Sequence, residues 1–239
     1  MTEKLPDLWG YNNYFGKELR IVYADGPNNI VYHNLLKPFA KLLRGRLKKK
    51  YQNTILITGH TGSGKSTIGV QLCYEIDKHF DIEKDYVYGS KDMKRKFKDP
   101  NACPVSLLDE GSVSLNSYNS MRSDDKKLTI LLDTARVLGK TNVICMPEMG
   151  DLNKRVRHNH IDFLIKCPVK SPIPGYDARG FYTLYSHEYR EWASDWWMPI
   201  GTSIFPPMDK EVAEKYDRIK LAHLMPLLDE FTEETEEDL

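Results

Sequence analysis

Gly59-His60-Thr61-Gly62-Ser63-Gly64-Lys65-Ser66-Thr67 has the pattern GxxxxGK[ST], in which a glycine-rich loop is followed by a lysine and a hydroxyl side chain. Residues 54–58, just before it, form a short apolar run, and residues 68–80, just after it, place apolar side chains at helical spacing. A strand, a loop and a helix are the context that this motif requires. The sequence therefore predicts a loop that binds the phosphates of a nucleoside triphosphate.

Each part of this loop has a chemical role. Glycines let the backbone turn its N–H groups inward around phosphate oxygens, because they have no Cβ and accept positive φ. The N-terminus of the following helix adds partial positive charge. We expect Lys65 to reach the β- and γ-phosphates and the Ser66 hydroxyl to ligate Mg²⁺. The alternative is a chance glycine-rich turn, which would occur in roughly one chain in a hundred.

A second apolar run, residues 105–108, ends in two adjacent carboxylates, Asp109 and Glu110. It follows the loop at a distance that leaves room for one more strand and helix. We expect Asp109 to hold Mg²⁺ through its water shell, and Glu110 to orient and deprotonate the attacking water. The simpler alternative is a strand that ends in a solvated acidic turn.

The second carboxylate separates classes of nucleotide enzyme. A kinase needs an acceptor site rather than a residue that activates water, and a GTPase would carry an NKxD segment, which this sequence lacks. ATP hydrolysis is therefore favoured over phosphoryl transfer to a second substrate and over GTP hydrolysis.

Charge is unevenly placed along the 239 residues, although 34 basic and 34 acidic side chains give a net charge of zero. No acidic side chain occurs in residues 26–74, whereas the last eleven residues carry seven. This asymmetry predicts a basic surface for a polyanion and a disordered acidic tail. The basic segments are residues 41–50, 91–98 and 154–157. For the first of them, the alternative is a solvated helix face.

Other features point to a cytoplasmic protein without a zinc knuckle or a disulfide framework. No apolar run approaches the roughly 18 residues of a membrane span, and no charged-then-apolar leader opens the chain. The 4 cysteines are widely spaced and form no CxxC pair, so we expect small buried side chains.

The order of the expected elements indicates an α/β fold, with a mostly parallel five-stranded sheet and helices on both faces. We divide the chain into an N-terminal extension with a basic helix (1–53), a nucleotide-binding core (54–170), a C-terminal appendage of a β-ribbon and a helix (171–228), and the acidic tail (229–239). The last helix is expected to stop at Pro226. Further strands are expected at residues 86–88, 142–146 and 163–167, and further helices at residues 34–50, 124–138 and 151–157.

Three tryptophans, Trp192, Trp196 and Trp197, fall close together in the expected appendage. Packing within the appendage is the first interpretation. Contact with a neighbouring subunit and stacking on nucleotides are the alternatives.

Residues 55–169 resemble the additional-strand (ASCE) P-loop ATPases of the FtsK/HerA and viral genome-packaging type, including small Zot-like ATPases of phages and mobile elements. The resemblance is carried by the loop at residues 59–67 (Walker A), the Asp109-Glu110 pair (Walker B), a helix with Arg136, and the strand at residues 142–146 followed by Pro147 and a basic turn. It implies a RecA-like P-loop NTPase with strand order 5-1-4-3-2, assembled as a homo-oligomeric ring with ATP at each interface.

The resemblance also implies an arginine that one subunit donates to its neighbour. Arg136 matches that position, just ahead of the fourth strand, and Arg122, on the loop after Glu110, is the competing candidate. A surface or salt-bridging arginine is the alternative for each. The family commonly ends the fourth strand with Gln, Asn or Thr, which senses the γ-phosphate. This chain has Cys145-Met146-Pro147-Glu148 there, so Glu148 is the candidate sensor.

Together, the residues and the resemblance predict an ATP-hydrolysing DNA motor that uses ATP and Mg²⁺, with DNA translocation or viral genome packaging as its task. Double-stranded DNA and a viral capsid or portal are the implied partners. One alternative is a Zot-like ATPase of phage assembly or export. Another is a small-molecule kinase, which should lack DNA-stimulated hydrolysis and be active as a monomer.

Overall fold

The computed structural model describes residues 21–24, 30–88, 90–99, 101–109, 130, 132–134, 138–152, 154–190 and 193–237. Three predicted site residues, Glu110, Arg122 and Arg136, lie outside these ranges, as do Trp192 and most of the helix expected at residues 124–138. Trp197 is described, and its ring packs beside that of His187 with centroids 4.8 Å apart.

The described strands form one mixed sheet of nine, in the order β1-β2-β9-β8-β7-β3-β6-β5-β4. Their bounds are β1 Ile21–Ala24, β2 Ile30–Tyr32, β3 Asn53–Thr58, β4 Tyr86–Val87, β5 Val105–Leu108, β6 Thr141–Met146, β7 Phe163–Lys166, β8 Phe181–Arg190 and β9 Ala193–Ile204.

The centre of this sheet is parallel. Strands β7, β3, β6, β5 and β4 are hydrogen-bonded in that order, each parallel to the next. Numbered along the chain from β3, the order is 5-1-4-3-2. Every residue of β3 and of β6 is buried, as expected for parallel strands with both faces covered. All five carboxyl ends therefore meet at one edge of the sheet.

The sheet continues past the five expected strands. β8 pairs antiparallel with both β7 and β9, and β2 pairs parallel with β9. The prediction of a five-stranded sheet is therefore corrected, because the ribbon and the N-terminal strands extend the same sheet. An uncovered β7 would present a row of unpaired backbone groups, which β8 satisfies.

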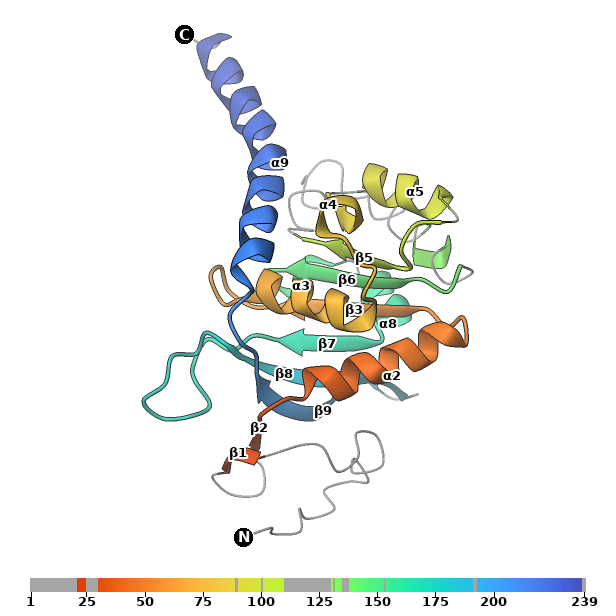
Figure 1. Cartoon of the computed structure of the whole chain (residues 1–239), viewed down its shortest axis with the longest axis vertical. Helices are drawn as coiled ribbons and strands as arrows, with labels where there is room; N and C mark the ends of the chain where they lie inside the picture. Colours follow the sequence, from red (N-terminus) through yellow and green to blue (C-terminus); the bar gives the residue numbers. More distant parts are fainter. Residues whose placement is uncertain are drawn as a thin grey trace.

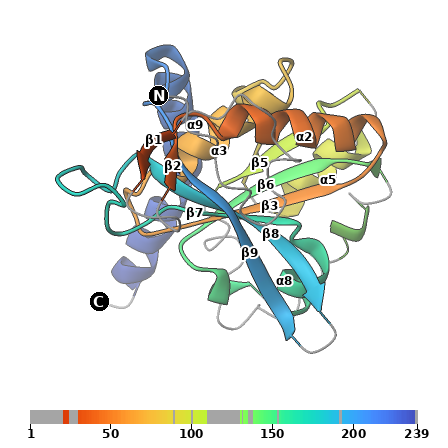
Figure 2. The ribbon, with the colours of Figure 1, turned by 90° about the horizontal axis from the view of Figure 1, so that it is seen from below.

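Helices cover both faces. α2 (Leu36–Lys48) and α3 (Lys65–Ile76) lie on one side of the sheet, and α8 (Lys154–His160) lies on the other (Figure 2). Alternate residues of a strand point to opposite faces. Ile55 and Ile57 accordingly join the core beneath α2 and α3, while Leu56 joins the core beneath α8. The remaining helices are α4 Ile82–Asp85, α5 Ser90–Lys98, η2 Met149–Asp151 and α9 Lys210–Glu237.

Helix α9 corrects two expectations about the C-terminal region. It continues through Pro226, where the sequence predicted its end, and residues 229–237 form its last turns instead of a disordered tail. Proline removes one helical hydrogen bond, but the glutamates after it favour helix, so the helix continues past Pro226. Among the described helices, none combines the length and the apolar character that a membrane span needs.

A buried ion pair holds the sheet edge next to β4. The Lys96 ammonium lies 2.9 Å from the Asp85 carboxylate, and each side chain is 6% exposed. The same ammonium donates a hydrogen bond to the Val105 carbonyl oxygen. Asp85 also accepts a hydrogen bond of 2.8 Å from the Asp81 amide. Lys96 therefore serves the fold, and it is not free for the phosphate contacts expected of residues 91–98.

Replacing Lys96 by Met should lower the free energy of unfolding by about 3–5 kcal/mol, because the Asp85 carboxylate would stay buried without its partner. Urea unfolding followed by circular dichroism measures the change. Lys84→Met is the matched control, since Lys84 is exposed where it pairs with Asp81 and surface ion pairs contribute little. Equal urea midpoints for Lys96→Met and the wild-type protein would contradict the assignment.

Candidate nucleotide-binding site

The carboxyl ends of the parallel strands bring the predicted site residues to one edge of the sheet. Gly59 follows β3, Asp109 follows β5 and Cys167 follows β7. The Gly59 amide donates a 3.1 Å hydrogen bond to the Pro147 carbonyl, and the Cys167 amide donates a 2.8 Å bond to the Thr58 carbonyl. The loops after β3, β6 and β7 are thus tied together at the edge where ligands bind in open α/β sheets.

The glycine-rich loop curves around its own lysine. Lys65 is the first residue of α3, and its ammonium donates hydrogen bonds of 2.8 Å to the Gly59 carbonyl and 2.9 Å to the His60 carbonyl. His60, Thr61 and Gly62 are exposed at the tip of the loop. The Lys65 ammonium therefore lies against the loop backbone that is predicted to bind phosphates.

Two glycines of the loop are required by close packing. A Cβ on Gly59 would lie 2.8 Å from the Cys167 carbonyl oxygen, and a Cβ on Gly64 would lie 2.7 Å from the Phe205 ring. Gly64 also has a φ of 92°, a conformation that side chains disfavour. Phe205 follows β9 and is buried, so the end of the ribbon packs against the phosphate loop.

The cysteines near the loop are structural. Cys145, on β6, and Cys167 are both buried and free. Burial raises the pKa of Cys145 well above its usual value and that of Cys167 to about 11. Both thiols therefore stay protonated at neutral pH and pack as small apolar side chains, as the sequence predicts.

The two predicted magnesium ligands meet at a tyrosine. Asp109 is 2% exposed, and its carboxylate accepts a hydrogen bond from the hydroxyl of Tyr216, on α9. The Ser66 side chain lies near the same hydroxyl, where it acts to lower the pKa of Tyr216. Burial, followed by the Asp109 carboxylate, raises the pKa of Tyr216 far above its ordinary value, so this hydroxyl remains a donor.

This arrangement fits a magnesium ion. The Ser66 hydroxyl and the Asp109 carboxylate are hard oxygen donors of the kind that Mg²⁺ prefers. Asp109 directly follows β5 and Ser66 is the second residue of α3, two elements that pack together, so both groups lie at the same edge of the sheet.

The other predicted residues are only partly placed. Glu148 is exposed two residues after β6, at the start of η2, and its side chain makes no capping hydrogen bond there. Glu148 follows Pro147, whose carbonyl accepts the hydrogen bond from the Gly59 amide, so Glu148 lies on the same edge of the sheet as Gly59. Its role as sensor stays a prediction, as do the roles of Glu110, Arg122 and Arg136.

Sequence reasoning missed the contribution of the C-terminal region to this edge. Besides Phe205 and Tyr216, the Gln71 side chain on α3 donates a 2.7 Å hydrogen bond to the Pro206 carbonyl, in the linker before α9. The spacing of Val212, Tyr216, Ile219 and His223 predicts an amphipathic helix. No signal in that spacing says which surface the helix covers.

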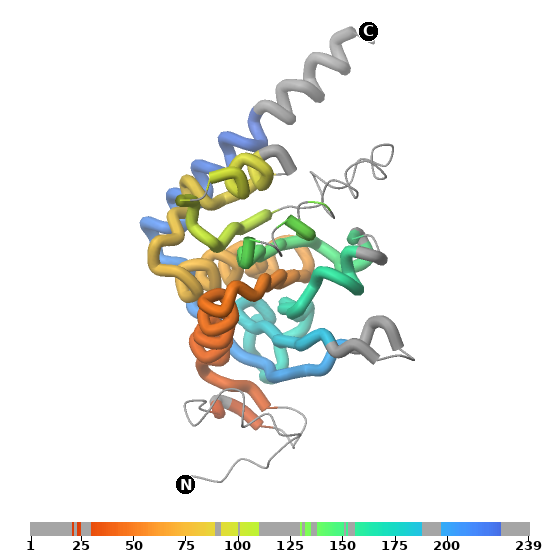
Figure 3. The backbone as a smooth tube through the Cα atoms, turned by 90° about the vertical axis from the view of Figure 1, so that its right-hand side faces the viewer, coloured from red at the N-terminus to blue at the C-terminus, as the bar shows by residue number. Residues whose placement is uncertain are grey.

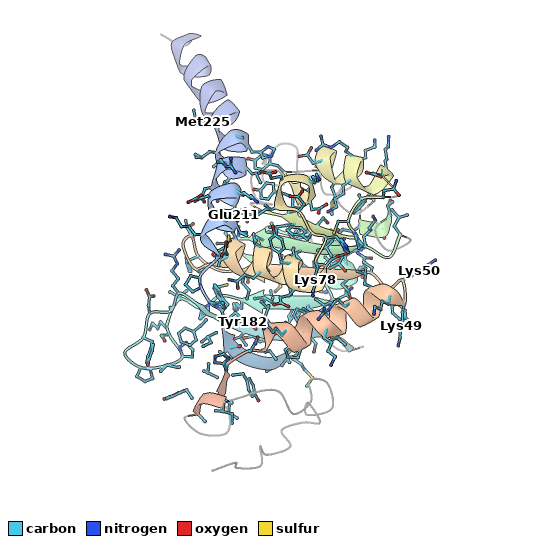
Figure 4. The ribbon with its side chains drawn as sticks, in the orientation of Figure 1. Lys49, Lys50, Lys78, Tyr182, Glu211 and Met225 are labelled. Carbon is cyan, nitrogen blue, oxygen red and sulfur yellow. The ribbon has the colours of Figure 1, made fainter. Side chains whose placement is uncertain are left out.

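The exposed lysines at the end of α2 lie away from this edge. Lys48, Lys49 and Lys50 are exposed where α2 ends, and Figure 4 shows Lys49 and Lys50 at the opposite side of the molecule from Glu211 on α9. β3, which begins near these lysines and ends at the loop, spans about 20 Å. Arg46, in the same segment, pairs with Asp162 at 3.0 Å and so contributes to the fold.

No protein-family model matches the chain, and no curated protein matches it. Among solved structures, it is similar to the N-terminal domain of zonular occludens toxin from Neisseria meningitidis, with 16% identity, a TM-score of 0.42, and coverage of 69% of this chain and 98% of that one.

Two further similarities are to AMPPCP-bound DnaA from Aquifex aeolicus and to a DNA replication initiation factor. The first has 16% identity, a TM-score of 0.40, and coverage of 63% of this chain and 49% of that one. The second has 14% identity, a TM-score of 0.38, and coverage of 55% of this chain and 45% of that one. The chain thus spans less than half the length of either protein. At such low identities and TM-scores, the function has to be argued from the residues of this chain.

Proposed function

We propose that this protein is a P-loop ATPase that hydrolyses ATP with Mg²⁺. The observation that carries the proposal is the placement of Asp109, buried at the end of β5, beside α3, whose second residue is Ser66. It occurs at the edge where the Lys65 ammonium lies inside the curve of the glycine-rich loop. Anion-binding backbone, a cation and two hard oxygen ligands together suit a magnesium-bound triphosphate.

Each residue has a stated part in this chemistry. The loop backbone and the N-terminus of α3 bind the phosphate oxygens, and Lys65 neutralises charge on the β- and γ-phosphates. Ser66 and Asp109 hold Mg²⁺, which when bound offsets the negative charge of the phosphates. Glu110, next to Asp109, accepts a proton from the water that attacks the γ-phosphorus. An arginine of a neighbouring subunit, Arg136 or Arg122, stabilises the charge on the transferring group, and Glu148 senses the γ-phosphate.

The finer task that we propose is the movement of double-stranded DNA by a homo-oligomeric ring, in DNA translocation or viral genome packaging. Its support is the exposed basic end of α2 within a stretch, residues 26–74, that has no acidic side chain. Lysines in such a setting suit phosphate contacts, which dominate sequence-independent DNA binding.

The test is ATP hydrolysis with and without double-stranded DNA, with the mass of the assembly measured in the same buffer. A DNA motor should show hydrolysis that DNA stimulates, in a multimer. Hydrolysis that DNA leaves unchanged would favour a Zot-like assembly or export ATPase. A monomer that consumes ATP only when a small acceptor is present would be a kinase.

Replacing Lys48, Lys49 and Lys50 together by Gln should weaken DNA binding about equally for all sequences. It should also reduce the slope of log affinity against log salt by roughly 0.9 for each duplex phosphate that the variant no longer neutralises. Fluorescence anisotropy with labelled duplexes, titrated at several salt concentrations, measures both quantities.

A triple change at Lys84, Lys170 and Lys210, all exposed and outside the basic segments, is the control of equal charge. It should leave the salt slope unchanged. An equal loss of affinity in the two triple variants would show that net charge alone acts. No loss in either would mean that the lysines only solvate the end of α2.

A further inference from the structure

Helix α9 reaches the nucleotide-binding edge through one buried tyrosine. It lies beside α3 and contacts α4 (Figure 1 and Figure 3). Tyr216, in the second turn of α9, is 7% exposed and belongs to the main core. Its hydroxyl is the only described side-chain group hydrogen-bonded to the Asp109 carboxylate. A residue outside the two nucleotide motifs thus engages Asp109, one of the two predicted magnesium ligands.

We propose that Tyr216 is an autoinhibitory residue whose hydroxyl occupies the Asp109 carboxylate in place of hydrated Mg²⁺, so that docking of α9 at this contact and binding of magnesium–ATP exclude each other. The inference rests on the proposed ATPase function. The hydroxyl donates a hydrogen bond to the Asp109 carboxylate, and a hydrated cation held by the same oxygen needs that oxygen to be released. Magnesium–ATP must therefore displace Tyr216.

The contacts that hold the start of α9 are suited to reversible release. The His223 ring stacks on Tyr88 and Tyr86, with centroids 4.8 and 5.8 Å apart, and Arg218 lies 4.0 Å from Glu83 at the surface. The linker before α9 borders a cavity of about 650 Å³, lined by Phe205, Pro206 and Met208 among others.

Tyr216→Phe tests the inference, because it keeps the ring that packs edge-on against Tyr86 and removes only the hydroxyl. We expect magnesium–ATP to bind roughly 10- to 100-fold more tightly to the variant, because one hydrogen bond to a charged group is lost. Its loss raises the fraction of molecules in which the site is open, and the apparent affinity rises with that fraction. Binding of ATP in EDTA should be unchanged. Titration with a fluorescent ATP analogue, with and without magnesium, measures both affinities.

Tyr185→Phe is the matched control, since it removes the hydroxyl of a half-buried tyrosine on β8 and should alter neither affinity. Tyr216→Phe binding that is unchanged or weaker with magnesium, while the wild-type protein binds normally, would overturn the inference. Weaker binding would make Tyr216 a residue that positions Asp109. If neither the wild-type protein nor Tyr216→Phe binds magnesium–ATP, the proposed function is overturned, and this inference with it.

Hydrogen exchange provides a second readout that does not depend on the substitution. In the wild-type protein, the amides of residues 210–225 should exchange faster with magnesium–ATP than with ATP in EDTA, because release of Tyr216 frees the start of α9. His223→Ala removes the ring stacking without touching a nucleotide ligand, and it should tighten magnesium–ATP binding in the same direction. Unchanged exchange, together with unchanged affinity in His223→Ala, would contradict the coupling.

Discussion

Replacing Glu110 by Gln is expected to lower ATP turnover by roughly 10²–10⁴-fold, the range for removal of a positioned general base. Binding of magnesium–ATP should be retained, because the phosphate ligands and the magnesium ligands are unchanged. Glutamine has nearly the same shape as glutamate, but it does not accept the proton of the attacking water. Single-turnover hydrolysis and equilibrium nucleotide binding, measured on the same preparation, separate the two effects.

Two further glutamates make the Glu110 experiment specific. Glu214→Gln changes an exposed carboxylate on α9 that pairs with Lys210 of the same helix, and it should leave turnover unchanged. Glu148→Gln tests the candidate sensor, whose loss should alter the response to the γ-phosphate more than the chemical step. Near-normal turnover in Glu110→Gln would remove Glu110 from the mechanism, and a large loss in Glu148→Gln would make that residue the better candidate.

Lys65→Ala should reduce ATP hydrolysis by roughly 10²–10³-fold or more, the effect of removing one donor to developing charge, and nucleotide affinity should fall with it. The ammonium contacts only two loop carbonyls, those of Gly59 and His60, so the fold should survive. Calorimetry with magnesium–ATP measures the affinity, and circular dichroism checks the folding of the variant.

Lys78→Ala is the control for Lys65→Ala. Lys78 is exposed just beyond α3 (Figure 4), so its loss changes the net charge equally at the far end of the same helix. Its ATP affinity should match that of the wild-type protein. A folded Lys65→Ala variant with unchanged affinity would show that the loop does not bind phosphates in the expected way.

The central strands were predictable because local sequence decides them. The strands expected at residues 54–58 and 142–146 are confirmed as β3 and β6, each beginning one residue earlier. Both are short apolar runs bounded by glycine or proline, and both are buried on two faces, so no alternating pattern is needed. The GxxxxGK[ST] spacing likewise placed the loop between β3 and α3, because its glycines meet a backbone requirement that few other residues satisfy.

Charged residues show where local sequence stops being informative. Lys96 and Arg46 belong to basic segments predicted to contact nucleic acid, yet each pairs with an aspartate outside its own segment, Lys96 with Asp85 and Arg46 with Asp162. A lysine or arginine has the same local pattern whether it faces solvent or a buried carboxylate. The difference depends on which elements pack together, and burial then makes the pairing obligatory.

By itself, the sequence determined the glycine-rich loop between β3 and α3 and the alternation of strands and helices. Tertiary structure alone decided that the ribbon continues the sheet, and that Tyr216 reaches Asp109 across 107 positions of sequence. Local patterns follow from backbone geometry and side-chain period, and a short stretch of sequence is enough to show both. The contact between Tyr216 and Asp109 depends on the packing of α9 against α4 and the main core, which the whole folded chain decides.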